Sequence, residues 1–107
     1  MSDLKELTEA MHHFVEAKGW YAENSLRPQT PRNTAISLCL EAAEVLEHFQ
    51  WEDGVRNLPE LEGELADVAL YLLQLAHITG IDLEQAIYKK LDQNYRRSWD
   101  QDRQSDQ

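Results

Sequence analysis

Two pairs of acidic residues interrupt the most apolar segments of this sequence. Glu41 and Glu44 stand three positions apart, and so do Glu64 and Asp67, each pair among Leu, Ala and Val without an interleaved Lys or Arg. Residues at that spacing share one helix face, and burying an uncompensated carboxylate is costly. Four such oxygen donors, brought together where two helices meet, suit the hard cations Mg²⁺ and Mn²⁺. The pattern predicts a divalent-cation site, whereas solvated helix faces are the simpler explanation for acidic residues elsewhere.

The sequence around these pairs predicts four helices and no strand. Ser2 is expected to cap a helix that reaches Gly19, and Thr30-Pro31 to open a second one. The expected helices span 2–19, 31–49, 59–79 and 83–99, with Gly80 after the third and Asp82 as cap of the fourth. No segment alternates apolar and polar residues with period two. We therefore expect an all-α, four-helix-bundle-like single domain over 1–99, followed by a disordered polar tail over 100–107.

Composition excludes several classes of protein. The chain has 107 residues, enough for one domain, and its 20 acidic against 10 basic residues give a net charge of −10. Such a charge disfavours binding to nucleic acid or to an anionic membrane. The single cysteine, Cys39, rules out an internal disulfide and is expected in the core. The charged first residues and the absence of a long apolar run predict a cytoplasmic protein.

Two of the expected helices are apolar on nearly every side. In 35–46 the polar side chains are Ser37, Glu41 and Glu44, and 65–76 is similarly apolar. A helix of this kind must be buried all round, and four helices of one short chain cannot cover two of them. We therefore expect a homo-oligomer.

The acidic pairs, read as E41-x-x-E44 and E64-x-x-D67, resemble the ExxE…ExxD signature of the all-α nucleotide pyrophosphohydrolases, the MazG-like superfamily. The chain is most similar to the dCTP pyrophosphatase branch, over PRNTAISLCLEAAEVLEHFQW, ELADVALYLLQLA and KKLDQNYRR. The resemblance implies a tetramer built as a dimer of dimers. It also implies metal-dependent hydrolysis of a deoxynucleoside triphosphate, dCTP foremost, to the monophosphate and pyrophosphate.

The resemblance also assigns site residues. It implies that the four carboxylates bind Mg²⁺, with Mn²⁺ as the alternative, and that Glu41 or Glu44 accepts a proton from the attacking water. Further residues are implied in substrate binding: the base would contact Trp20, Trp51 and Tyr71, and the triphosphate would lie near Lys90, Asn94 and Arg97. Met11 occupies the position of a base-contacting histidine in that branch, so His12 or His13 is the candidate substitute.

Several of these residues have structural alternatives. Trp51 ends an apolar segment and could be a core residue, whereas Trp20 follows Gly19 in a loop, where a large ring often marks a ligand site. The basic cluster of Lys89, Lys90, Arg96 and Arg97 could complement a helix dipole instead of binding phosphate. We expect His48 and His77 to be structural.

Two other functions fit parts of the sequence. A non-catalytic acidic helical module that binds a partner protein would need no metal, but it leaves the carboxylates unexplained. A di-iron four-helix protein requires two Glu-x-x-His motifs, and Glu9-x-x-His12 is the only one in the chain.

Overall fold

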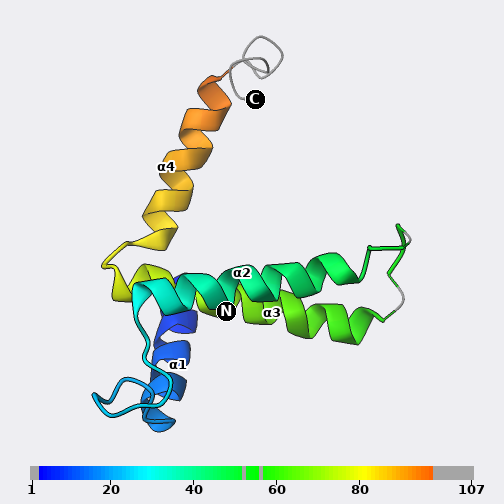
Figure 1. The fold of residues 1–107 in the computed structure, drawn as a ribbon. Helices are drawn as coiled ribbons and strands as arrows, with labels where there is room; N and C mark the ends of the chain where they lie inside the picture. Colours follow the sequence, from blue (N-terminus) through cyan, green and yellow to red (C-terminus); the bar gives the residue numbers. More distant parts are fainter. Residues whose placement is uncertain (1–2, 52, 56, 98–107) are drawn as a thin grey trace.

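The computed structural model describes residues 3–51, 53–55 and 57–97. In this part of the chain the regular structure consists of four helices: α1 (Leu4–Ala17), α2 (Pro31–Glu47), α3 (Leu58–Ile78) and α4 (Leu83–Arg96) (Figure 1). The prediction of an all-α fold with four helices is confirmed. The tail expected over 100–107 lies outside the described residues. The fourth helix ends at Arg96, three residues before the expected end, because Arg97 has an extended backbone conformation.

Local interactions set three of the helix ends as expected. The Thr30 hydroxyl accepts a hydrogen bond from the Asn33 N–H at 3.1 Å, and the Asp82 carboxylate accepts one from the Gln85 N–H at the same distance. Gly80 follows α3 with a φ of +75°, a conformation that residues with a Cβ rarely adopt.

Several predicted helix boundaries are wrong by one to three residues. The cap of α1 is Asp3 and not Ser2, because the Asp3 carboxylate accepts a hydrogen bond from the Glu6 N–H at 2.9 Å. Asn57 caps α3 in the same way, so this helix begins one residue before Pro59. The first and second helices end at Ala17 and Glu47, each two residues before the expected end. The third helix ends at Ile78, one residue before the expected end.

Helices α2 and α3 run antiparallel along each other, and α1 crosses α3 near its C-terminal end (Figure 1). Met11 and Val15 of α1 form the buried core with Leu73 of α3. Helix α4 projects away from the α2–α3 pair (Figure 1). The Cα radius of gyration is 16.9 Å, whereas a compact domain of this length has one of about 13 Å. A single chain is therefore elongated and its helices do not close into a compact bundle.

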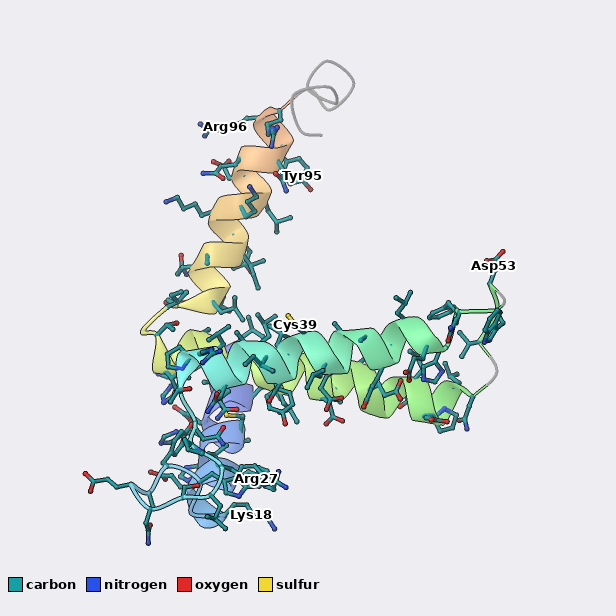
Figure 2. All side chains as sticks on the ribbon, viewed as in Figure 1. Lys18, Arg27, Cys39, Asp53, Tyr95 and Arg96 are labelled. Atoms are coloured by element: carbon teal, nitrogen blue, oxygen red, sulfur yellow. The ribbon has the colours of Figure 1, made fainter. Side chains whose placement is uncertain are left out.

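The open arrangement leaves large apolar side chains on α2 and α3 in solvent. Leu40 and Leu46 of α2 are 62% and 68% exposed, and Leu65 of α3 is 51% exposed. Cys39 is also exposed, on α2 (Figure 2), so its expected place in the core is wrong for the single chain. The reason is that α1 covers only one end of the α2–α3 pair and α4 does not pack along it.

Among the described residues, no helix is both long enough and apolar enough to cross a bilayer.

Candidate functional site

The residues of chemical interest form a ladder along the contact between α2 and α3. From one end to the other, the first set is Ser37, Glu41 and Glu44 of α2 and His48, which caps that helix. The set across from it on α3 is Tyr71, Asp67, Glu64 and Glu60. Steps of four, three and four residues occur on both helices in opposite directions, which keeps each set on one helix face. We call these eight residues the α2–α3 ladder.

The four predicted carboxylates occupy the middle of the ladder and lie close enough to interact. Burial raises the pKa of Glu41 above its ordinary value of 4.5, and hydrogen bonding to Glu44 raises it further. The negative charges of Glu44, Asp67 and Glu64 act in the same direction. The Oε2 atom of Glu41 is buried without a hydrogen-bond partner. A cation bound here would give the buried Glu41 oxygen a partner and would offset the negative charges of the neighbouring carboxylates.

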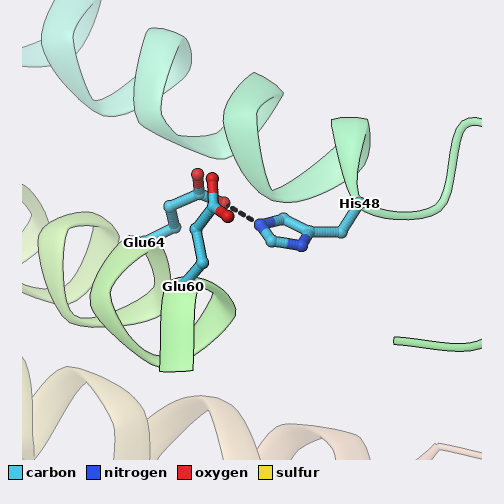
Figure 3. Close-up of side chains that lie close together, drawn as sticks. All are labelled: His48, Glu60 and Glu64. Atoms are coloured by element: carbon cyan, nitrogen blue, oxygen red, sulfur yellow. Dashed lines mark hydrogen bonds and ion pairs between the residues drawn. The ribbon is translucent and has the colours of Figure 1, made fainter. Parts of the chain in front are cut away.

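At one end of the ladder, His48 contacts the acidic residues of α3 (Figure 3). Its Nε2 atom is hydrogen-bonded to the Glu64 carboxylate, and the ligand atoms of His48, Glu60 and Glu64 all lie within 4.8 Å of one another. The sequence interpretation treated His48 as structural and did not single out Glu60. The signal that could have found both is the spacing itself, because His48 follows Glu44 by four residues and Glu60 precedes Glu64 by four.

This end opens into a hollow of about 230 Å³. The hollow is lined by Glu44, Glu47, His48, Trp51, Asn57, Glu60 and Glu64. Trp51 is 85% exposed, so the alternative that it packs in the core is wrong for the single chain.

The other end of the ladder adjoins a second hollow, of about 250 Å³, where Trp20 and Tyr71 come together. The remaining lining residues are Leu26, Arg27, Pro28, Gln29, Asn33, Thr34 and Ser37. The sequence analysis assigns no role to Arg27, Gln29 or Asn33. Arg27 and Gln29 stand in a loop and Asn33 in the first turn of α2, and local sequence does not tell which of these side chains line a hollow.

Tertiary contacts hold the loop that carries Trp20. The Arg27 guanidinium lies 5.3 Å from the centre of the Trp20 ring, and Phe14 packs edge-on against that ring with centroids 5.6 Å apart. Gln74, which is buried on α3, donates a hydrogen bond to the Gln29 side chain at 2.5 Å. The aromatic hollow is therefore fixed to both α1 and α3.

Other predicted residues are not brought together within one chain. Trp20 and Trp51 line hollows at opposite ends of the ladder, and Ser37 and His48, which mark those ends on α2, are about 16 Å apart along a helix axis. Lys90 and Asn94 stand on α4 and line neither hollow. Arg97 follows directly after α4 and is also absent from both linings.

The histidines of α1 face a third region. His12 and His13 line a hollow of about 390 Å³ near the start of α4, and the His12 ring lies 4.6 Å from that of His77. Neither His12 nor His13 is among the residues around Trp20, so the structure offers no support for either as a substitute base contact there. Glu9 lines the same third hollow, away from the ladder, which removes the basis for the di-iron hypothesis.

A family model for the MazG-like family matches residues 36–107, and the chain belongs to this family. Among characterised proteins, dCTP pyrophosphatase 1 from Mus musculus is 37% identical over 76 residues and that from Homo sapiens is 40% identical over 76 residues. Each match covers 63% of this chain but only 45% of the relative, so the chain spans less than half the length of these proteins.

A solved structure supports the same family. The crystal structure of a pyrophosphatase from Archaeoglobus fulgidus DSM 4304 superposes with a TM-score of 0.75 at 34% identity, covering 90% of this chain and 92% of that one. The family resemblance drawn from the two acidic motifs is confirmed.

The raised pKa of Glu41 predicts a pH-dependent stability in EDTA. A carboxyl group whose pKa is higher in the folded chain than in the unfolded chain holds its proton more tightly when folded. The free energy of unfolding therefore falls as pH rises above 4.5. Glu41→Gln removes this loss and should raise the melting temperature at pH 7, with the gain shrinking to nothing below pH 4.5. Glu62→Gln, at an exposed α3 position, is the control. A gain of equal size at every pH would contradict the assignment.

Proposed function

We propose that the protein is a divalent-cation-dependent nucleoside triphosphate pyrophosphohydrolase. Its preferred substrates would be deoxynucleoside triphosphates, dCTP foremost, which it would convert with water to the monophosphate and pyrophosphate. The observation that carries this proposal is the group of four interacting carboxylates on two facing helices, with a buried and unpartnered oxygen on Glu41. The names of the relatives, dCTP pyrophosphatase 1 and a pyrophosphatase, support the reaction.

The carboxylates fit a hard cation. Glu41 and Glu44 would hold it from α2, and Glu64 and Asp67 from α3, because oxygen donors are the ligands that Mg²⁺ and Mn²⁺ prefer. Bound there, the cation supplies charge neutralisation for the phosphates and lowers the pKa of a water molecule. This also explains how a chain with a net charge of −10 could accept a triphosphate.

The protein's own groups then have definite tasks in the reaction. Water attacks the α-phosphorus, the bond to the bridging α–β oxygen breaks, and pyrophosphate leaves with the electron pair of that bond. Glu41 or Glu44 accepts the proton of the attacking water, since both carboxylates lie in the middle of the ladder.

The aromatic hollow is the proposed base site. Tyr71 lies one helical turn from Asp67, so a base held against Trp20 and Tyr71 would place its phosphates along the ladder toward the carboxylates. Stacking increases affinity for the nucleotide but discriminates little between different bases. The Asn33 and Gln29 side chains, which line the same hollow, offer the donors and acceptors that could select a base edge.

A second copy of the chain would complete the site. The apolar residues left exposed on α2 and α3, including Leu40, Leu46 and Leu65, favour self-association. Four of the residues implied in substrate binding lie away from the aromatic hollow of their own chain: Trp51, Lys90, Asn94 and Arg97. We propose a homotetramer, built as a dimer of dimers, in which these residues approach the ladder of a neighbouring copy.

Asp67→Asn and Glu44→Gln should each abolish turnover while the chain stays folded, because each removes a cation ligand and one repulsive charge. We expect activity to fall by at least about 100-fold, beyond the usual effect of losing a residue that only supports a ligand. The measurement is pyrophosphate release from dCTP in Mg²⁺, with circular dichroism as the folding check. Near-wild-type turnover in either variant is incompatible with the assigned site, and Glu62→Gln provides the unaffected control.

A panel of ribo- and deoxynucleoside triphosphates, scored for pyrophosphate rather than phosphate, tests substrate choice. We expect dCTP to be preferred and at least one other deoxynucleotide to be accepted at a comparable rate.

Trp20→Ala should mainly raise KM, since stacking stabilises the bound substrate and the transition state to the same extent. Equal turnover of every nucleotide by the wild-type protein, or an unchanged KM in Trp20→Ala, would contradict the proposed base site. An absence of turnover with all of them would favour the protein-binding module.

Sedimentation at micromolar concentration should reveal a tetramer. Leu40→Asp adds a charge to an exposed apolar position of α2 and should yield smaller species with the same helix content. Glu62→Gln, at an exposed polar position of α3, is the control and should leave the assembly intact. A folded wild-type monomer would refute the proposal of self-association.

A further inference from the structure

The end of the ladder at His48 contains a donor that the four-carboxylate group lacks. Among the described residues, those that line this hollow include four carboxylates and neither Lys nor Arg. Within this described lining, His48 provides the one imidazole. Like charges gathered in a partly buried space raise one another's energy. A cation bound at this end would relieve that repulsion.

The donor atoms lie close to the spacing of a coordination shell. The nearest ligand atoms of His48, Glu60 and Glu64 lie within 4.8 Å of one another and come from both helices. An ion with bonds of about 2.0–2.2 Å keeps neighbouring ligand atoms about 3–4 Å apart, so small side-chain rotations would suffice. The side chains of His48 and Glu64 are only 8% and 18% exposed, whereas Glu60 is exposed and leaves the group open to solvent (Figure 3).

The imidazole decides which ion suits the group. Mg²⁺ prefers oxygen ligands and retains much of its water, whereas first-row transition dications bind imidazole nitrogen together with carboxylate oxygen. We propose that His48, Glu60 and Glu64 bind a first-row transition dication such as Zn²⁺ or Co²⁺. This site shares Glu64 with the four-carboxylate group and differs from it in its other two donors, His48 and Glu60.

Because Glu64 belongs to both donor sets, the two sites would influence each other. A transition dication held at His48 would draw the Glu64 carboxylate toward the end of the ladder and change its availability to an ion in the middle. This proposal concerns ion binding and does not rest on the activity proposed above. The competing explanation is that His48 only positions Glu64 through their hydrogen bond.

The first experiment uses the wild-type chain and its four histidines. With excess Mg²⁺ present, Co²⁺ is titrated into ¹⁵N-labelled protein while the imidazole resonances are recorded. We expect the His48 resonances to shift or broaden beyond detection at the first equivalent, before those of His12, His13 and His77. If Co²⁺ binds while the His48 imidazole stays unchanged, or if the His12 and His77 resonances respond first, the proposal is overturned.

The second experiment measures Co²⁺ affinity through its visible absorption bands. His48→Gln keeps a side chain able to hydrogen-bond Glu64 but removes the imidazole, and Glu60→Gln removes one carboxylate. Each should weaken binding by at least about tenfold, whereas His13→Gln and Glu62→Gln, which alter residues outside this hollow, should not.

Unchanged Co²⁺ affinity in His48→Gln would leave His48 with the positioning role alone and overturn the proposal. Pyrophosphate release in Mg²⁺ is followed in parallel. If Co²⁺ binding is lost and turnover is retained, this site fails a test that the proposed function passes. If Co²⁺ binds and no nucleotide is turned over, the site stands and the proposed function fails.

Discussion

The antiparallel register of α2 against α3 is the constraint on which the site depends. The two helices carry their polar ladder residues at matching steps of four, three and four, so one register places every pair opposite its partner. A slip of one residue would turn a helix face by about 100° and separate the pairs. Apolar residues of the same helices, such as the buried Leu61, maintain this register although the carboxylates between them repel.

The ladder has two chemically different ends, and each is held by contacts outside the α2–α3 pair. At the Tyr71 end, the loop before α2 is fixed by Gln74 bonding to Gln29 and by Arg27 over Trp20. At the His48 end, the turn after α2 leaves Trp51 exposed beside the acidic hollow. An aromatic surface and an acidic one are thus joined by a row of carboxylates, an arrangement suited to a ligand with a flat ring and a charged chain.

The single chain leaves part of its own apolar surface uncovered. Helix α4 extends away from α2 and α3, and Leu40, Leu46 and Cys39 remain in solvent (Figures 1 and 2). The radius of gyration of 16.9 Å reflects this shape. The proposed association with another copy would account both for these exposed helix faces and for the direction of α4 away from the ladder.

Local chemistry by itself determined the helices and the acidic pairs. Thr30, Asp82 and Gly80 set helix ends through bonds or backbone conformations confined to a few neighbouring residues, and the i, i+3 spacing put each carboxylate pair on one face. Only the tertiary structure decided which residues of α2 meet which of α3, that His48 reaches Glu64, and that Trp20 and Trp51 lie at opposite ends. It also decided that Cys39 lies outside the core of the single chain. These outcomes depend on packing between residues far apart in sequence, where helix register and the direction of α4 are set by surfaces that no local pattern specifies.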